Sequence, residues 1–324
     1  MHAVRIHQLV GPSGLQLDEV PEPACGAGEV LIDVRAAGVN FPDVLLSHGK
    51  YQFNPTPPFV PGGEVAGVVR QVGAGVTSVA EGDRVAATML HGAFAERVVV
   101  PELATVKLPD AVSFETGAAT LLTYLTTIHA LEDRAATRPG ETLLVLGAAG
   151  GVGLAAVEIG KMLGARVLAA ASTDEKLAVC KEHGADEVIC YGREDLKERV
   201  KALTRGAGAN VVYDPVGGSY AEPALRAIAW EGRYLVVGFA TGEIPRIPLN
   251  LVLLKGCQIV GVFWGAFAMK EPAKNRANGA RIFAAVAAGT LRPRVDAVLP
   301  FSRAGEALER MARREVRGKI VLVP

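Results

Sequence analysis

A glycine-rich turn between an apolar run and a helical pattern is the feature that most constrains the fold of this chain. Residues 143–161 read LLVLGAAGGVGLAAVEIGK, with the turn from Gly147 to Gly153. Glycines are needed where a backbone must approach a phosphate closely, because a Cβ would fill that space. The N-terminus of the following helix would supply free N–H groups and the positive end of its dipole. The segment therefore predicts a nucleotide-binding strand–turn–helix unit, with a purely structural turn as the alternative.

Strands and helices alternate after this turn. We expect strands at 142–146, 166–170, 187–190, 210–213, 233–237 and 258–262, and helices at 152–163, 174–183, 196–203 and 220–229. Apolar strands that alternate with helices indicate a parallel sheet covered on both faces. About 140 residues of such alternation is the size of a doubly wound dinucleotide-binding fold.

The regions before and after this segment have different sequence patterns. The first 110 residues combine short β-rich runs with turn sequences such as GPSG and EGD, which predicts a compact, barrel-like β domain with an irregular loop at 54–63. The expected strands are 4–8, 29–36, 64–72, 84–88 and 95–100. One or two helices are expected within 112–133, further helices at 280–288 and 300–309, and a closing strand at 319–323. That last strand most simply returns to the first domain.

Composition narrows the class of protein. The chain has 324 residues, which suggests two domains, and 34 Lys+Arg balance 34 Asp+Glu. A zero charge balance gives no reason to expect a nucleic acid or an anionic membrane as partner. No apolar run approaches the roughly 18 residues of a membrane span, and the N-terminus has no signal-peptide core. Four scattered cysteines fit a reducing compartment. We expect a cytoplasmic protein.

The end of the second strand of the parallel sheet bears on which nicotinamide cofactor would bind. An acidic residue usually holds the adenosine ribose there, but the strand ends in alanines followed by Ser172 and Thr173. Small residues, hydroxyls and Lys176 suit a 2′-phosphate, so NADPH is expected rather than NADH. Ser172 also has capping-box spacing to Glu175, so it is expected to be the N-cap of the next helix. Both roles of Ser172 are compatible.

The segment 36–67, AAGVNFPDVLLSHGKYQFNPTPPFVPGGEVAG, carries a resemblance to a known family. Other motifs follow in order: LTTIHAL at 125–131, STDEK at 172–176, YDPVGG at 213–218, AWEGRYLVVGF at 229–239 and RGKIVLV at 317–323. Together with AAGGVG, these resemble the zinc-independent quinone oxidoreductase (zeta-crystallin-like) family of the medium-chain dehydrogenase/reductase superfamily. The resemblance covers essentially the whole chain.

The resemblance implies a fold class and an assembly. The expected class is α/β: a Rossmann doubly wound parallel sheet plus an N-terminal GroES-like β-barrel domain. The catalytic domain would span 1–117, the NADPH-binding domain 118–262, and residues 263–324 would complete the catalytic domain, with a cleft for nicotinamide and substrate. The apolar strand 258–262 is expected at the sheet edge, where exposure would invite aggregation. The family pairs this strand across a two-fold axis, so a homodimer is expected.

The resemblance also bears on metal binding. Zinc-dependent cousins place a Cys and a His–Glu pair around this loop, where this chain has Asn40 and Gly63-Glu64. Catalytic zinc needs about three protein ligands, and the six histidines are dispersed along the chain. We expect no metal site. Without a Lewis acid, the expected substrate is a quinone or α,β-unsaturated carbonyl, which accepts hydride once it is oriented against the nicotinamide.

Three residues are candidates for the catalytic site by resemblance. Asn40 and Asp43 would lie beside the nicotinamide, and Tyr51 would border the substrate, where its phenol could donate to a developing enolate. Structural alternatives are a turn residue for Asn40, a loop-capping carboxylate for Asp43 and a packing aromatic for Tyr51. The expected cofactor contacts are Thr126, Gly150, Gly151, Val152, Ser172, Lys176, Tyr191, Gly238, Phe239, Phe263, Trp264 and Arg314. The aromatics could instead pack in the core, and Arg314 could form a surface salt bridge.

Two other functions remain open at this stage. An enoyl-thioester reductase of the same family would need room for an acyl carrier, which the sequence does not decide. A non-catalytic NADPH-binding crystallin-like protein would bind the cofactor without hydride transfer.

Overall fold

The computed structural model describes all residues from Met1 to Pro324, and the chain divides into two compact units. Unit 1 comprises Met1–Leu122 together with Phe267–Pro324, and unit 2 comprises Thr123–Ala266. These boundaries lie a few residues beyond those expected from the sequence. None of the helices has both the length and the apolar character needed to span a membrane.

Unit 1 is built around a mostly antiparallel sheet, in which only the pair β14–β15 runs parallel. Its strands are β1 (His2–Ile6), β2 (Leu15–Glu19), β3 (Glu29–Gly38), β4 (Glu64–Val72), β5 (Arg84–Thr88), β6 (Arg97–Pro101), β7 (Thr105–Lys107), β14 (Val295–Pro300) and β15 (Lys319–Val323). Seven of these form one sheet, in the order β14-β15-β3-β4-β5-β7 with β6 on the other side of β3. The closing strand β15 pairs antiparallel with β3, so the prediction that it returns to the first domain is confirmed.

Four helices belong to unit 1. They are α1 (Phe41–Ser47), α2 (Phe114–Ala118), α10 (Pro272–Ala287) and α11 (Ala304–Ala312). The helix expected at 280–288 is the second half of α10, and the helix expected at 300–309 begins only at Ala304, after a short 3-10 turn at Phe301–Arg303. Helix α1 was not expected, because the prolines and glycines around it hide its short helical pattern.

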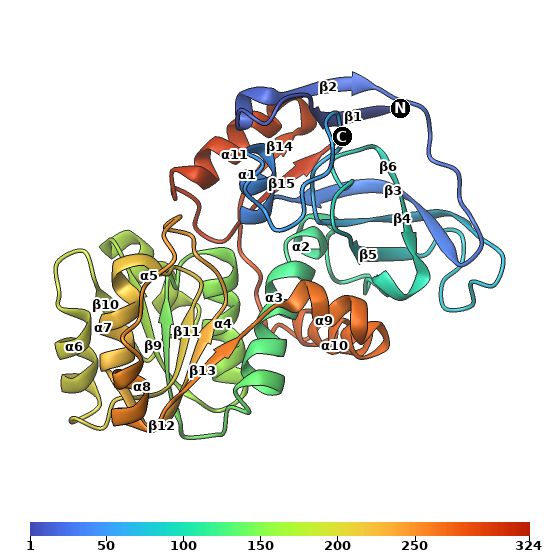
Figure 1. Cartoon of the computed structure of the whole chain (residues 1–324). Helices are drawn as coiled ribbons and strands as arrows, with labels where there is room; N and C mark the ends of the chain where they lie inside the picture. Colours follow the sequence, from blue (N-terminus) through green and yellow to red (C-terminus); the bar gives the residue numbers. More distant parts are fainter. The chain divides into compact units, whose positions relative to one another are not determined.

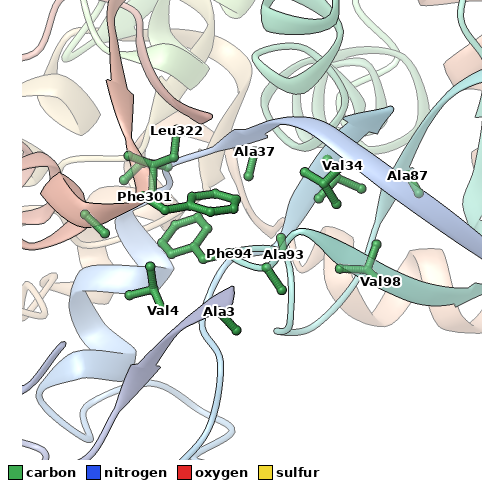
Figure 2. Packing of buried hydrophobic residues seen from close by; sticks show 14 of the residues in the cluster. Ala3, Val4, Val34, Ala37, Ala87, Ala93, Phe94, Val98, Phe301 and Leu322 are labelled. Carbon is green, nitrogen blue, oxygen red and sulfur yellow. The ribbon is translucent and has the colours of Figure 1, made fainter. Parts of the chain in front are cut away.

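The core of unit 1 collects small and branched side chains from strands far apart in the sequence. Figure 2 shows members of this cluster, including Phe94, Phe301 and Leu322, together with residues from the first strand. Phe94 is fully buried. Gly62 packs against it with a positive φ of 98°, and a Cβ there would lie 2.5 Å from the Phe94 ring. This close approach fixes the start of β4, which carries Glu64.

Unit 2 is a parallel sheet with helices on both faces (Figure 1). Its strands are β8 (Thr142–Leu146), β9 (Arg166–Ala171), β10 (Glu187–Cys190), β11 (Ala209–Asp214), β12 (Ile228–Val236) and β13 (Gln258–Gly261). The helices are α4 (Gly151–Met162), α5 (Asp174–Glu182), α6 (Leu196–Leu203), α7 (Ala221–Arg226) and α8 (Leu249–Lys255). Helices α3 (Leu121–Ile128) and α9 (Trp264–Lys270) span the two boundaries between the units.

The strand order β10-β9-β8-β11-β12-β13 is that of a doubly wound fold. The order reverses between β8 and β11, which run parallel side by side. Strand β13 lies at the edge, as expected. The helix expected at 220–229 is shorter, because the chain leaves it at Ala227 and pairs Ile228 with Ala209 as the start of β12.

One expectation about a helix end was wrong. The N-cap of α5 is Thr173 and not Ser172. The Thr173 hydroxyl accepts a hydrogen bond from the Lys176 N–H at 3.4 Å. Ser172 remains in the loop before the helix and is exposed. Trp264, one of the expected cofactor contacts, is the first residue of α9. Gly184, which follows the C-cap of α5, adopts a positive φ of 99°.

Candidate functional site

The carboxyl ends of the parallel strands in unit 2 carry nearly all the expected cofactor contacts. The turn after β8 holds Gly150, Gly151 and Val152; Ser172 follows β9, Tyr191 follows β10, Gly238 and Phe239 follow β12, and Phe263 and Trp264 follow β13. In open α/β sheets, ligands bind at this edge, outside the point where the strand order reverses. Residues from separate motifs are thus brought together at the carboxyl ends of the strands of one sheet.

The glycine turn brings the start of α4 close to the end of β8 and leaves space at the helix N-terminus. A Cβ on Gly153 would lie 2.3 Å from the Gly147 carbonyl oxygen, so only glycine lets α4 start this close to the end of β8. At Gly150, the N-cap of α4, a Cβ would meet no atom nearer than 3.5 Å. Gly150 stands at the N-terminus of a twelve-residue helix, and helix N-termini are places where anions bind.

The corner at the ends of β9 and β10 gathers groups suited to a phosphate. The Lys176 ammonium lies 3.5 Å from the Ser172 hydroxyl, and the rings of Tyr191 and Tyr220 are 4.3 Å apart. Asp174 forms two 2.7 Å hydrogen bonds with the Arg193 guanidinium, which lowers the pKa of Asp174. Because Arg193 neutralises this carboxylate, it does not oppose a phosphate at the corner.

Asp214, at the end of β11, shapes the neighbouring loop and was not singled out from the sequence. Its Oδ1 accepts hydrogen bonds from the N–H groups of Val216 and Gly217 at 2.7 and 2.9 Å, and its Oδ2 accepts one from the Tyr234 hydroxyl. Burial raises its pKa above the ordinary value. The Asp-Pro sequence could have indicated this role, since an Asp side chain in a turn often accepts a hydrogen bond from the backbone two residues further on.

The other expected cofactor contacts are placed as follows. Thr126 is almost fully buried on α3, and Gly238 lies beside the Asp214 loop, where its N–H bonds the Asp214 carbonyl at 3.3 Å. Phe263 is 59% exposed. Arg314 belongs to unit 1, in the turn after α11 with a positive φ of 59°, and not to the sheet edge that gathers the others. Its contact with the cofactor stays a prediction.

The Asn40 loop of unit 1 holds the other candidates. Asp43 is 1% exposed, and its two carboxylate oxygens accept hydrogen bonds from the N–H groups of Asn40 and Gly62 at 2.7 and 3.1 Å. Asp43 therefore ties the start of α1 to the loop before β4. Its contacts are those of a loop-organising carboxylate, which was the structural alternative from the sequence. Burial raises its pKa to about 7.

Asn40 makes its side-chain contacts with buried groups. Its amide nitrogen donates to the Glu64 carboxylate at 2.9 Å and to the Gly38 carbonyl at 3.2 Å, and its amide oxygen accepts from the Lys319 ammonium. Both amide hydrogens are thereby used within unit 1. A hydrogen bond from Asn40 to a substrate would need one of these contacts to break, so its role toward the acceptor stays a prediction.

Lys319 was missed by the sequence reasoning. It lies in the apolar closing strand, is 3% exposed, and its ammonium is 2.5 Å from Oε1 of fully buried Glu64. The signal was a lysine inside a strand that otherwise reads Ile-Val-Leu-Val, because a buried cation requires a partner of opposite charge.

Tyr51 is the third catalytic candidate and lies partly buried. It packs against a small apolar cluster of Ile6, Leu46 and Phe59. Burial and the nearby Asp43 charge both raise the pKa of the Tyr51 phenol above its ordinary value. The hydroxyl therefore keeps its proton at neutral pH and remains able to donate a hydrogen bond. On the same loop, Phe53 stacks on His91 with the ring centres 5.9 Å apart.

Possible metal-binding side chains are not gathered anywhere in the chain. No group of three or more His, Cys, Asp or Glu side chains lies close enough together to hold one ion. The four cysteines are free thiols. Around the Asn40 loop, Lys319 is already the cation that neutralises Glu64.

Comparison with known domain families matches both parts of the chain. Residues 26–110 match the family described as alcohol dehydrogenase GroES-like domain, and residues 151–278 match the family described as zinc-binding dehydrogenase. The first range lies within unit 1, and the second covers most of unit 2. The expected fold class, a Rossmann sheet plus a GroES-like domain, is confirmed.

Individual proteins resemble the chain over its whole length. It is 39% identical to the quinone oxidoreductase-like protein 2 homolog of Nematostella vectensis, over 99% of this chain and 88% of that protein. It is 36% identical to the quinone oxidoreductase of Pseudomonas aeruginosa, over 97% of each. The Escherichia coli quinone oxidoreductase, solved in complex with NADPH, superposes with a TM-score of 0.92 at 30% identity over 100% of both chains.

The fold and the sheet-edge site therefore define a medium-chain dehydrogenase/reductase. Within that superfamily, the chain belongs to the quinone oxidoreductase family. The resemblance drawn from the sequence motifs is confirmed at this level.

Proposed function

We propose that this protein is an NADPH-dependent oxidoreductase that transfers hydride to a quinone or an α,β-unsaturated carbonyl without a metal ion. The observation that carries the proposal is the gathering of the glycine turn, the Ser172–Lys176 corner and the Asp214 loop at one sheet edge. The Escherichia coli quinone oxidoreductase and a mycobacterial relative of 33% identity were both solved as complexes with NADPH, which supports the choice of cofactor.

The residues present fit this cofactor. The N–H groups at the start of α4 would hold the pyrophosphate, since Gly150 leaves room there. Lys176 and Ser172 would bind the 2′-phosphate through charge-assisted hydrogen bonds. When bound, NADPH supplies the hydride from C4 of its nicotinamide.

Metal-free reduction is supported by the lack of a three-donor cluster and by the chemistry of the acceptor. A quinone or enone needs positioning and a hydrogen bond to the oxygen that gains negative charge. We assign that hydrogen bond to the Tyr51 hydroxyl, with Asn40 and Asp43 fixing the loop that precedes it. Phe53, two residues after Tyr51, stacks on His91 from the loop after β5, which adds aromatic surface next to the Tyr51 loop.

The test is an acceptor screen with purified protein. NADPH oxidation is followed with a quinone, an enone and an enoyl thioester, each with and without a chelator. We expect turnover of the quinone or the enone, unchanged by the chelator. Turnover of the thioester alone, binding of NADPH without turnover, or loss of activity on chelation would each contradict the proposal.

Replacing Tyr51 by phenylalanine removes only the hydroxyl. We expect kcat for the acceptor to fall about tenfold, since a hydrogen bond to a developing charge contributes roughly 1.5 kcal/mol or more. NADPH affinity should be unchanged, because the expected contacts with the cofactor do not include Tyr51. Steady-state kinetics check the first point and fluorescence titration the second. An unchanged kcat would show that Tyr51 is a packing aromatic.

A homodimer through the edge strand β13 belongs to the same proposal. The edge is open, and exposed apolar side chains lie on it and on α8, with Leu253 at 80%, Leu254 at 69% and Ile259 at 42%. A second copy that pairs with this strand would cover them and satisfy its backbone groups.

Substitution of Leu253 by glutamate tests this assembly. The molar mass of the wild-type protein measured by light scattering should be twice 33.9 kDa, and Leu253→Glu should lower it toward that of the monomer. Val10→Glu is the matched control, because Val10 is 57% exposed on unit 1. A monomeric wild type, or an equal effect of both variants, would contradict the dimer.

A further inference from the structure

Four buried polar side chains meet beneath the Asn40 loop of unit 1. Asn40, Asp43, Glu64 and Lys319 are 4%, 1%, 0% and 3% exposed. They come from the loop before α1, from α1 itself, from the start of β4 and from the start of β15. A buried cluster of this kind is costly unless its members satisfy one another.

The charges of the cluster do not cancel when all its groups are ionised. Asp43 and Glu64 carry two negative charges, and Lys319 carries the single positive one. Lys319 contacts Glu64 at 2.5 Å and also bonds the Asn40 amide oxygen. The other Glu64 oxygen accepts from the Leu122 N–H at 2.9 Å. The cluster becomes neutral only when one carboxylate takes up a proton.

The ion pair fixes the orientation of the Asn40 amide. Its oxygen faces the Lys319 ammonium, and its nitrogen faces the Glu64 carboxylate. A rotation of the amide by half a turn would point N–H groups at a cation and the oxygen at an anion. The backbone N–H of Asn40 is held in turn by Asp43 at 2.7 Å.

We propose that Lys319 is a positioning residue for the acceptor site: it orients Asn40 and, with Glu64, sets the electrostatic balance at Asp43. The inference rests on the proposed function, because the loop it organises leads to Tyr51. Lys319 acts through Asn40 and Asp43 and not by contact with the acceptor.

The charged groups that shift the pKa of Asp43 are Lys319 and Glu64, and Tyr51 is the titratable group that the Asp43 charge affects. Burial raises the pKa of Asp43, the hydrogen bonds from the Asn40 and Gly62 N–H groups and the Lys319 charge lower it, and the Glu64 charge raises it, with the balance at about 7. The Asp43 charge in turn raises the pKa of Tyr51. Asp43 therefore changes charge near neutral pH, and its ionisation is felt at the Tyr51 phenol.

Substitutions of the two ion-pair partners should move the Asp43 pKa in opposite directions. Lys319→Met removes the cation and should raise it by about one unit or more, and Glu64→Gln removes the anion and should lower it. The double variant Lys319→Met/Glu64→Gln should return it toward the wild-type value. The measurements are carbon-13 NMR of the Asp43 carboxyl, assigned with Asp43→Asn, and the pH profile of kcat/KM for NADPH-dependent quinone reduction.

A structural role alone would not produce opposite shifts. Shifts of the same sign, or none in either single variant, would overturn the proposal. If Lys319→Met does not fold, two other variants still test the proposal. Lys319→Arg keeps the charge and should leave the Asp43 pKa near the wild-type value, and Glu64→Gln should lower it. The NMR measurement needs no acceptor, so its outcome is separate from failure of the proposed quinone or enone activity.

Discussion

Gly153→Ala is expected to lower NADPH affinity by up to about 100-fold and to lower the melting temperature of the protein. The new Cβ would lie 2.3 Å from the Gly147 carbonyl oxygen and 2.7 Å from Ala148 backbone atoms, none of which can move independently. Helix α4 would have to shift away from the turn. Overpacking of this kind costs about 1–3 kcal/mol, and 2.7 kcal/mol corresponds to a factor of about 100. Isothermal titration and thermal melting measure the two effects.

Gly150→Ala is the matched control in the same turn. Its Cβ would meet nothing nearer than 3.5 Å, and its φ of −79° is open to alanine. We expect an unchanged melting temperature but weaker NADPH binding, because the methyl group would occupy the space beyond the helix N-terminus. Equal binding by Gly150→Ala and the wild type would show that the pyrophosphate does not bind at this turn.

The double substitution Ser172→Asp/Lys176→Ala is expected to reverse the preference between NADPH and NADH. Loss of the lysine removes a charge-assisted hydrogen bond of about 1.5–3 kcal/mol, and the new carboxylate would repel a 2′-phosphate while accepting hydrogen bonds from a free ribose. NADPH affinity should fall about 100-fold and NADH affinity should rise. Titration with both cofactors measures the ratio.

Lys181→Ala serves as its control, because Lys181 is exposed at the other end of the same helix, α5. It should bind NADPH as the wild type does. A preference for NADPH that survives the double substitution would place the 2′-phosphate elsewhere and contradict the assignment of Ser172 and Lys176.

The elements of unit 2 could be predicted closely because their signals are local. The boundaries of strands β8 and β10 and of helix α6 match the expected ranges 142–146, 187–190 and 196–203. Each is an apolar or amphipathic run bounded by its own turn or cap, such as the Asp195 carboxylate that accepts from the Glu198 N–H. Local sequence suffices when an element and its ends lie within about a dozen residues.

The contacts that organise the Asn40 loop could not be predicted in this way. Helix α1 begins beside a proline and is stabilised by Asp43, which bonds the Asn40 N–H and also Gly62 on a distant loop. Glu64 and Lys319 meet only because β15 returns to pair with β3, which in turn pairs with β4. Tertiary topology decides such pairings, so the sequence supplied the candidate residues without their partners.

The central claim is metal-free hydride transfer from NADPH to an electron-poor acceptor. Its most direct test uses NADPH that carries deuterium at C4 of the nicotinamide, an enone acceptor and protein stripped of metal by a chelator, with mass spectrometry of the product. We predict one deuterium in the reduced product at an undiminished rate. Product without the label, or turnover that stops on chelation and returns with added zinc, would contradict the claim.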